Sequence, residues 1–164
     1  METAQATEIE LKVLIECLKK KEVALQQIAD ITENQGFVID SELSHQDRYS
    51  FFMQMNHEKQ ESIDRVKDCD EVFANVFQKV GPILDDNPTK YGKQVTTMQN
   101  LIRVVMDLDI NIRLGEDANS KKLTKALNEV KIKLKEKPEP IGSGEYGSNK
   151  IISAYKSNAK PRTN

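Results

Sequence analysis

The sequence predicts an all-α protein: an elongated, antiparallel three-helix bundle with coiled-coil-like packing and a flexible C-terminal tail. The first supporting observation is composition, because 38% of the 164 residues are hydrophobic and only 5% are aromatic, which suits amphipathic helices better than sheets. The second is periodicity, because apolar residues recur at alternating spacings of three and four. The third is the presence of boundary signals, because a capping motif at 44–47, a loop with Gly and Pro at 81–93 and the prolines from 138 on delimit these runs. We therefore expect a bundle over residues 1–137 and a tail over 138–164.

The first helix is expected over about residues 8–43. Its apolar stripe consists of Leu11, Leu14, Leu18, Leu25 and Ile28. Lys21 occupies a position within that stripe where an apolar residue is expected. Gly36 is a weak point of the helix, because Gly costs roughly 1 kcal/mol relative to Ala in a helix interior.

The second helix is expected over about residues 45–80. Ser44 followed by Asp47 resembles a capping box with Asp in place of Glu, which predicts a helix start. The apolar stripe then consists of Phe52, Met55, Ile63, Val66, Phe73, Phe77 and Val80, and Asp70 interrupts it with a carboxylate. Gly81 and Pro82 are expected to end the helix, because Pro lacks an N–H and clashes with the preceding turn.

The third helix is expected over about residues 94–137, after a loop at 81–93. Its stripe consists of Val95, Met98, Ile102, Val105, Ile112, Leu123, Leu127, Val130 and Leu134. Gly115 and Asn119 interrupt the pattern and are compatible with a bend. Pro138 and Pro140 end the helix. In the tail, Ile151, Ile152 and Tyr155 would form the apolar face of a short amphipathic segment.

A register argument pairs the two polar residues that interrupt the apolar stripes. If the first two helices form a hairpin that turns near residues 44–46, facing residue numbers sum to roughly 90. Lys21 then faces Cys69 and Asp70. One interpretation is a structural polar layer that fixes the register at some cost in stability. The alternative is that both residues lie at the edge of the seam and Lys21 extends into water.

Nothing in the sequence points to catalysis. Glu42 and His45 form one Glu-x-x-His motif, whereas a di-iron helical bundle needs two copies and two further glutamates. Asp107 and Asp109 would point apart on a helix. The sequence has no phosphate-binding loop, Cys-x-x-Cys motif or nucleophile elbow. We therefore expect no enzyme activity, no cofactor and no metal site.

Charge and hydropathy predict a cytoplasmic protein. The net charge of −2 gives no reason to expect a nucleic-acid partner. The first residues lack the features of a signal peptide, and no apolar run approaches the roughly 18 residues of a membrane span, so membrane insertion is not expected. Cys17 and Cys69 lack metal-site spacing and are expected to be a reduced pair.

The end of the third helix is a candidate partner-binding surface. If the second and third helices are antiparallel, facing numbers sum to about 174, and Phe52 lies near Leu123. The stripe continues past that level, where little of the hairpin remains to pack against it. The hairpin end also carries Phe51 and Met53, and aromatic and Met side chains suit adaptable helix-binding surfaces. The candidate binding residues here are Leu123, Leu127, Val130, Leu134, Phe51 and Met53. In the alternative interpretation, a shifted register lets these residues close the bundle core.

The segment KQESIDRVKDCDEVF (59–73), the surrounding helices and a late AYK motif resemble the FlgN family, in its clostridia-like form. The resemblance covers most of residues 8–156. It implies a cytoplasmic flagellar chaperone without enzyme activity. Such proteins bind hook–filament junction proteins, hold their aggregation-prone terminal helices and deliver them to the flagellar type III export apparatus. The family's client contacts lie in the C-terminal part, which corresponds here to Leu127, Val130, Leu134, Ile151, Ile152 and Tyr155.

Two alternatives to this function follow from the same features. The first, implied by the same resemblance, is the related chaperone of the filament-cap protein, which is normally shorter. A structural coiled-coil or adaptor protein would use its apolar seam for self-association instead of client binding. The sequence is compatible with a homodimer of the free protein.

Overall fold

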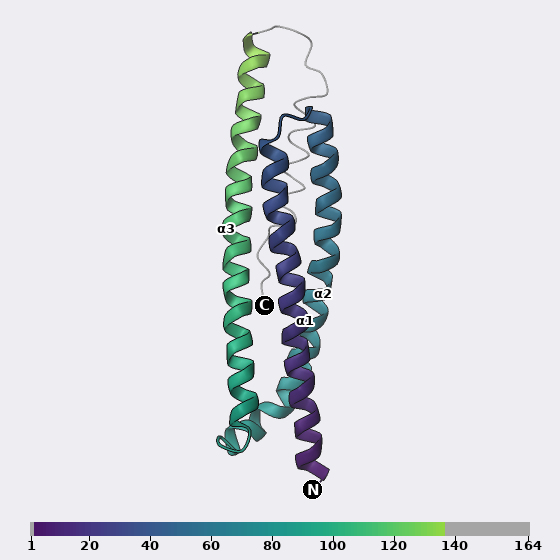
Figure 1. The fold of residues 1–164 in the computed structure, drawn as a ribbon, viewed down its shortest axis with the longest axis vertical. Coiled ribbons are helices and arrows are strands. Elements are labelled where there is room, and N and C mark those ends of the chain that lie inside the picture. Colours follow the sequence, from purple (N-terminus) through teal and green to yellow (C-terminus); the bar gives the residue numbers. More distant parts are fainter. Residues whose placement is uncertain (1, 137–164) are drawn as a thin grey trace. The chain divides into compact units, whose positions relative to one another are not determined.

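The computed structural model describes residues 2–136, which form three long α-helices (Figure 1). Helix α1 is Glu2–Asp40, α2 is His45–Asp86 and α3 is Gly92–Glu136. The helices pack antiparallel in chain order, and α1 contacts both α2 and α3. The predicted all-α architecture of three antiparallel helices is therefore confirmed.

Helix α2 begins where the sequence predicted. The backbone N–H of Asp47 donates to Ser44 Oγ at 3.2 Å, and the N–H of Arg48 donates to the Ser44 carbonyl at 2.9 Å. Ser44 thus caps the helix, because its hydroxyl satisfies one of the N–H groups that the first turn leaves without a partner.

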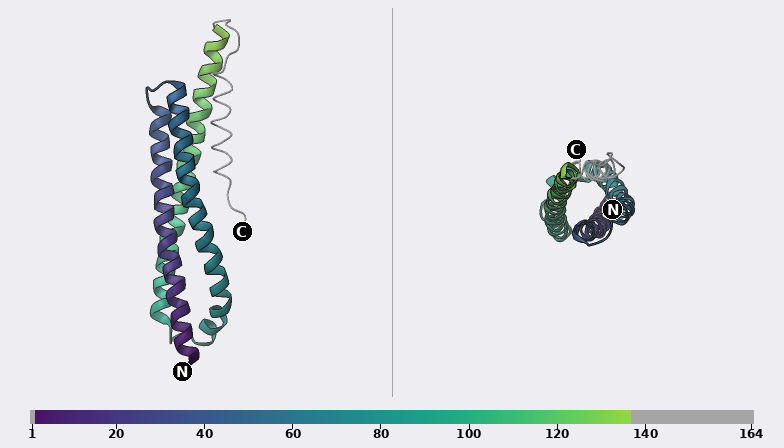
Figure 2. Two further views of the ribbon diagram at one scale, coloured as in Figure 1. Left: turned by 90° about the vertical axis from the view of Figure 1, so that its right-hand side faces the viewer. Right: turned by 90° about the horizontal axis from the view of Figure 1, so that it is seen from above.

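The predicted end of α2 at Val80 was wrong, because the helix continues through Pro82 to Asp86. Figure 2 shows the last turns of α2 set at an angle to the helix above them. An interior Pro costs about 3 kcal/mol, but the added turn packs Ile83 and Leu84 against the apolar core. Full burial of such side chains stabilises by about 1.5–3 kcal/mol each, so even partial burial offsets much of that cost.

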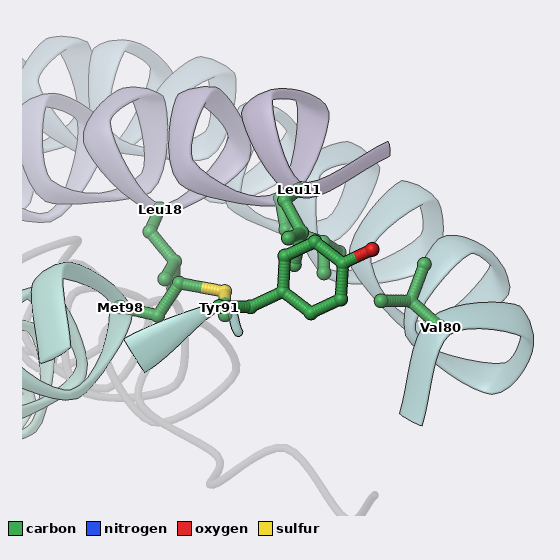
Figure 3. Close-up of a cluster of buried hydrophobic side chains, with 6 residues drawn as sticks. Leu11, Leu18, Val80, Tyr91 and Met98 are labelled. Carbon is green, nitrogen blue, oxygen red and sulfur yellow. The ribbon is translucent and has the colours of Figure 1, made fainter. Parts of the chain in front are cut away.

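The connection to α3 is therefore shorter than predicted and contributes to the core. Asn87 Nδ2 donates to the Ile83 carbonyl at 2.9 Å and closes the end of α2. Tyr91, the last residue before α3, is buried, and Figure 3 shows its ring among Leu11, Val80 and Met98. Because a Tyr in a predicted loop carries no periodic signal, the sequence pattern did not identify this core residue.

Contacts divide the chain into two compact units, each with segments of all three helices. The first unit comprises Met1–Gln27 and Ser62–Ile110. Its buried core cluster is apolar apart from the Tyr hydroxyl and consists of Leu11, Leu14, Leu18, Val80, Tyr91 and Met98. Phe73 and Phe77 stack beside it with ring centroids 5.7 Å apart.

The second unit comprises Ile28–Glu61 and Asn111–Asn164, of which residues 28–61 and 111–136 are described. Beside apolar residues it buries a set of polar ones: Thr32, Gln35, Asn56, Lys59 and Asn119. Gln35 Nε2 donates to Asn56 Oδ1 at 2.7 Å, and Asn119 Nδ2 donates to the Thr32 carbonyl at 2.8 Å. Lys59 Nζ lies 3.7 Å from Glu116 Oε1. We call these residues, with Glu116, the polar core.

Two glycines allow α1 and α3 to approach closely at the polar core. A Cβ atom on Gly115 would lie 3.1 Å from Thr32 Cγ2, and one on Gly36 would lie 2.8 Å from Asn119 Oδ1. Only a residue without a side chain fits such contacts without displacement. Helix α3 also continues through Gly115 without a break. The glycines that interrupt the sequence pattern therefore mark a helix contact.

Candidate partner-binding surface

The predicted partner-binding residues of α3 lie at the end of the second unit. Leu123 is buried, whereas Leu127, Val130 and Leu134 are half-buried along the same stripe. Figures 1 and 2 show the last turns of α3 extending past the loop that joins α1 to α2. Each of the two interpretations, closure of the core and an exposed surface, therefore describes part of this stripe. Leu123 closes the core, and the residues after it remain partly exposed.

A small cavity separates this stripe from the hairpin end of α1 and α2. Its volume is about 40 Å³. The cavity is lined by Val38, Ile39, His45, Arg48, Phe52, Leu123, Ala126, Leu127 and Val130. Phe52 and Leu123 line the same cavity, as the register predicted. A space of this size holds a few water-sized groups, so the stripe is less tightly packed here than a close-packed core.

The rim of this cavity is basic. Arg48 Nη1 donates to the Ile39 carbonyl at 3.2 Å, and Nη2 lies 3.2 Å from His45 Nδ1. Arg48 Nε is buried and has no hydrogen-bond partner among the described residues. Burial, followed by the positive charges of Arg48 and Lys133, lowers the pKa of His45 below its usual 6.5. His45 is therefore mainly neutral at pH 7, and Arg48 is the charged residue that lines the cavity.

The remaining predicted binding residues fall in two groups. Phe51 is exposed and Met53 is half-buried on α2, but neither is among the described residues that line the cavity. Ile151, Ile152 and Tyr155 lie outside the described residues. The surface that the structure defines is the stripe with the adjoining cavity, and we call it the α3 surface: Leu123, Leu127, Val130 and Leu134.

The structure brings Lys21 and Asp70 together in the first unit. Lys21 Nζ donates to Asp70 Oδ1 at 2.6 Å, which is the pairing that the register predicted. The side chains are 24% and 44% exposed, however, so the pair lies at the edge of the helix contact. An ion pair this exposed contributes about 0–1 kcal/mol. The pair therefore provides a smaller penalty for slipped registers than a buried polar layer would.

Sequence reasoning missed the polar core, although its own register contained the signal. Numbers that sum to about 90 pair Gln35 with Asn56, and numbers that sum to about 174 pair Lys59 with Glu116. Lys59 is only 1% exposed, and burial lowers its pKa to about 8 against the opposing effect of Glu116. Polar residues at these positions do not contribute to an apolar periodicity, so the sequence pattern does not distinguish a buried polar pair from a solvated helix face.

The two cysteines are free thiols in the first unit. Burial is the largest cause that raises the pKa of both thiols, and the positive charge of Lys20 opposes it. Both thiols are therefore protonated at neutral pH and are weak nucleophiles.

Within residues 2–136, no three His, Cys, Asp or Glu side chains gather into a set that could hold a metal ion. No described helix contains a stretch sufficiently long and hydrophobic to traverse a lipid bilayer. Comparison of the chain with protein-family models, with curated proteins and with solved structures gives no match.

Proposed function

We propose that this protein is a cytoplasmic export chaperone. It binds the terminal helices of flagellar hook–filament junction proteins and delivers them to the flagellar type III export apparatus. The observation that carries the proposal is the α3 surface, a partly exposed apolar stripe at a helix end that extends past its neighbours. The resemblance of residues 59–73 to the FlgN family supports the choice of client.

The α3 surface has the geometry that recognition of an amphipathic helix requires. Leu127, Val130 and Leu134 follow one another at spacings of three and four, so they form one continuous face. Full burial of a Leu or Val stabilises by about 1.5–3 kcal/mol, and these side chains are only half-buried in the free protein. A client helix that covers the stripe would gain the remaining part. The proposed activity consists of binding alone and involves no catalytic group, cofactor or metal.

A binding titration tests the proposal directly. Peptides with the terminal helices of the hook–filament junction proteins are titrated into the full chain, and the mass of the complex is measured by light scattering. We expect a defined complex with the wild-type protein. Leu127→Asp with Val130→Asp should weaken it at least tenfold, about 1.4 kcal/mol, because the charges would be buried under the client helix.

Ile132→Asp is the matched control, because Ile132 lies on the same helix but is 56% exposed and outside the stripe. Circular dichroism of all variants must show unchanged helix content. If no junction-protein peptide binds, or if the double variant binds as well as the wild type, the proposed function is wrong.

A second candidate function is self-association as a structural coiled coil or adaptor. The observation in its favour is the number of exposed large apolar side chains on α1 and α3, including Ile9, Val23, Met106 and Leu114. This function predicts a stable oligomer without any client. Peptides of the filament-cap protein, used in the same titration, test the remaining alternative of a filament-cap chaperone.

A further inference from the structure

A second apolar surface lies in the first unit, on helices α1 and α2. A groove of about 810 Å³ runs there along α1, with part of α2 as its other wall. On α1 it exposes Ile9, Val13 and Val23, and on α2 it exposes Val72. Ile9 and Val23 are 59% and 60% exposed. Large aliphatic side chains gathered on one surface are typical of an interaction site.

These residues form a stripe separate from the one that faces the core. Positions 9, 13 and 23 lie on one side of a helix with 3.6 residues per turn, whereas Leu11 and Leu14 are fully buried on another. Glu16 and Lys20 lie on the same side as these exposed residues, so this second side of α1 is mixed, and its apolar side chains are not covered within the first unit. Because the buried stripe with Leu11 and Leu14 dominates the periodicity of α1, the sequence pattern did not reveal the exposed residues at positions 9, 13 and 23.

The charges around the groove are mainly basic, although the chain as a whole is acidic. The groove is lined by four basic residues, Lys12, Lys19, Lys20 and Arg65, and two acidic ones, Glu16 and Asp68. Lys19 lies 3.6 Å from Glu16 and is partly neutralised by it. Within the part of the chain that the structure describes, Lys12 and Lys20 have no ion-pair partner. Lys12 borders the apolar side chains and Lys20 lies among them, so the groove complements an amphipathic helix that carries negative charge beside its apolar face.

The length of the groove fits a helix. It extends along α1 from Ile9 to Gln27, which corresponds to about 27 Å at about 1.5 Å per residue. Near Gln27 the two walls are tied together, because Arg65 Nη1 and Ser62 Oγ donate to Gln27 Oε1 at 3.1 and 3.2 Å. A helix of about 18 residues would occupy the groove up to this bridge.

We propose that this groove binds an amphipathic α-helix of another protein, with an apolar face flanked by Asp and Glu residues. A second copy of the chain fits less well, because two such grooves facing each other would carry the same net positive charge. The groove is separate from the α3 surface, and the inference does not depend on which client binds there.

The test uses two synthetic amphipathic peptides of about 18 residues with the same Leu face. One carries Glu on both flanks and the other carries Lys. Fluorescence anisotropy with the full chain should show at least tenfold tighter binding of the Glu peptide at low salt. The preference should shrink as salt is added, because salt screens exposed charges.

Three variants, each made in a chain that also carries Leu127→Asp with Val130→Asp so that the α3 surface cannot bind the peptides, locate the binding site. Lys12→Glu with Lys20→Glu should reverse the preference, and Val13→Asp with Val23→Asp should abolish binding of both peptides. Val104→Asp is the matched control, because Val104 is 40% exposed on α3 in the same unit and does not line the groove. The Glu peptide should also slow alkylation of Cys69, which lines the groove.

Three results would overturn the inference. The first is equal binding of both peptides, and the second is binding that survives Val13→Asp with Val23→Asp. The third is a dimer of the free protein that this double variant dissociates, since the groove would then be occupied by a second copy. None of these results bears on client binding at Leu127 and Val130, which the titration of junction-protein peptides tests separately.

Discussion

The two units of this protein bury different kinds of side chain. The first is held by an apolar cluster around Leu11, Leu14 and Val80. The second places Gln35, Asn56 and Lys59 in its interior, beside apolar residues such as Phe52. Apolar burial stabilises in proportion to area, whereas a buried polar group stabilises only if its hydrogen bonds are made. The stability of the first unit therefore depends mainly on buried apolar area, whereas that of the second also depends on the hydrogen bonds of its buried polar groups.

The polar core has a structural consequence of its own. A shift of one helix by one turn would separate Gln35 from Asn56 and Lys59 from Glu116, and would leave these groups buried without those partners. Even in the observed register, Gln35 Oε1 is buried without a hydrogen-bond partner among the described residues. We infer that the polar core specifies the helix register at a cost in stability, and that the second unit opens more readily than the first.

The largest effect is expected in the apolar core. Leu14→Ala should lower the free energy of unfolding by about 2–5 kcal/mol, because Leu14 is fully buried and its truncation leaves a cavity. Urea denaturation measures the loss. Val13→Ala, at the partly exposed neighbouring position, is the control and should change stability by much less. Similar losses for both variants would mean that the first unit is not closely packed around Leu14.

The second-largest effect is expected when one partner of the buried ion pair between Lys59 and Glu116 is removed. Glu116→Gln should lower stability by about 3 kcal/mol, because it leaves the positive charge of Lys59 buried without its carboxylate. Lys59→Met with Glu116→Leu should leave stability unchanged or higher, because both charges are removed together. Denaturation of the three proteins in parallel provides the measurement. A double variant less stable than Glu116→Gln would show that the pair stabilises the fold.

A smaller effect is expected from pH. The pKa of Lys59 is about 8 in the folded protein, lowered from 10.5 by burial. Between these values the unfolded chain binds more protons, so stability should rise with pH, by about 1–2 kcal/mol between pH 8 and 9.5. Thermal or urea unfolding across this range measures the rise. Lys59→Met should remove it, and a rise that persists in this variant must come from other groups.

The smallest effect concerns the exposed ion pair of the first unit. A double-mutant cycle with Lys21→Ala and Asp70→Ala should give a coupling energy below about 1 kcal/mol, because both groups are partly solvated. A coupling of several kcal/mol would show that this pair, rather than the polar core, dominates the register.

Features that depend on spacing along the chain could be predicted from the sequence. Periodicity gave the three helices, the capping motif gave the start of α2, and hairpin arithmetic gave the contact between Lys21 and Asp70. The same arithmetic placed Leu123 near Phe52 at the candidate site.

Features that depend on packing between distant segments could not be predicted in this way. Helix α2 passes Pro82 because burial of Ile83 and Leu84 outweighs a local penalty. Gly115 faces Thr32 from another helix, and no local rule reveals that contact. Phe51 was included in the candidate site because it is apolar, but helix geometry directs it away from the cavity.

Native-state hydrogen exchange tests most directly the claim that the two units differ in stability. The full chain is analysed by mass spectrometry at the level of short peptides. Helix-interior amides are compared, in order to exclude fraying at the helix ends. We expect amides at 48–59 and 112–122, around the polar core, to exchange at least tenfold faster than those at 11–18 and 73–80. Lys59→Met with Glu116→Leu should reduce this difference. Equal protection in both units, or faster exchange in the first, would contradict the claim that the polar core makes the second unit easier to open.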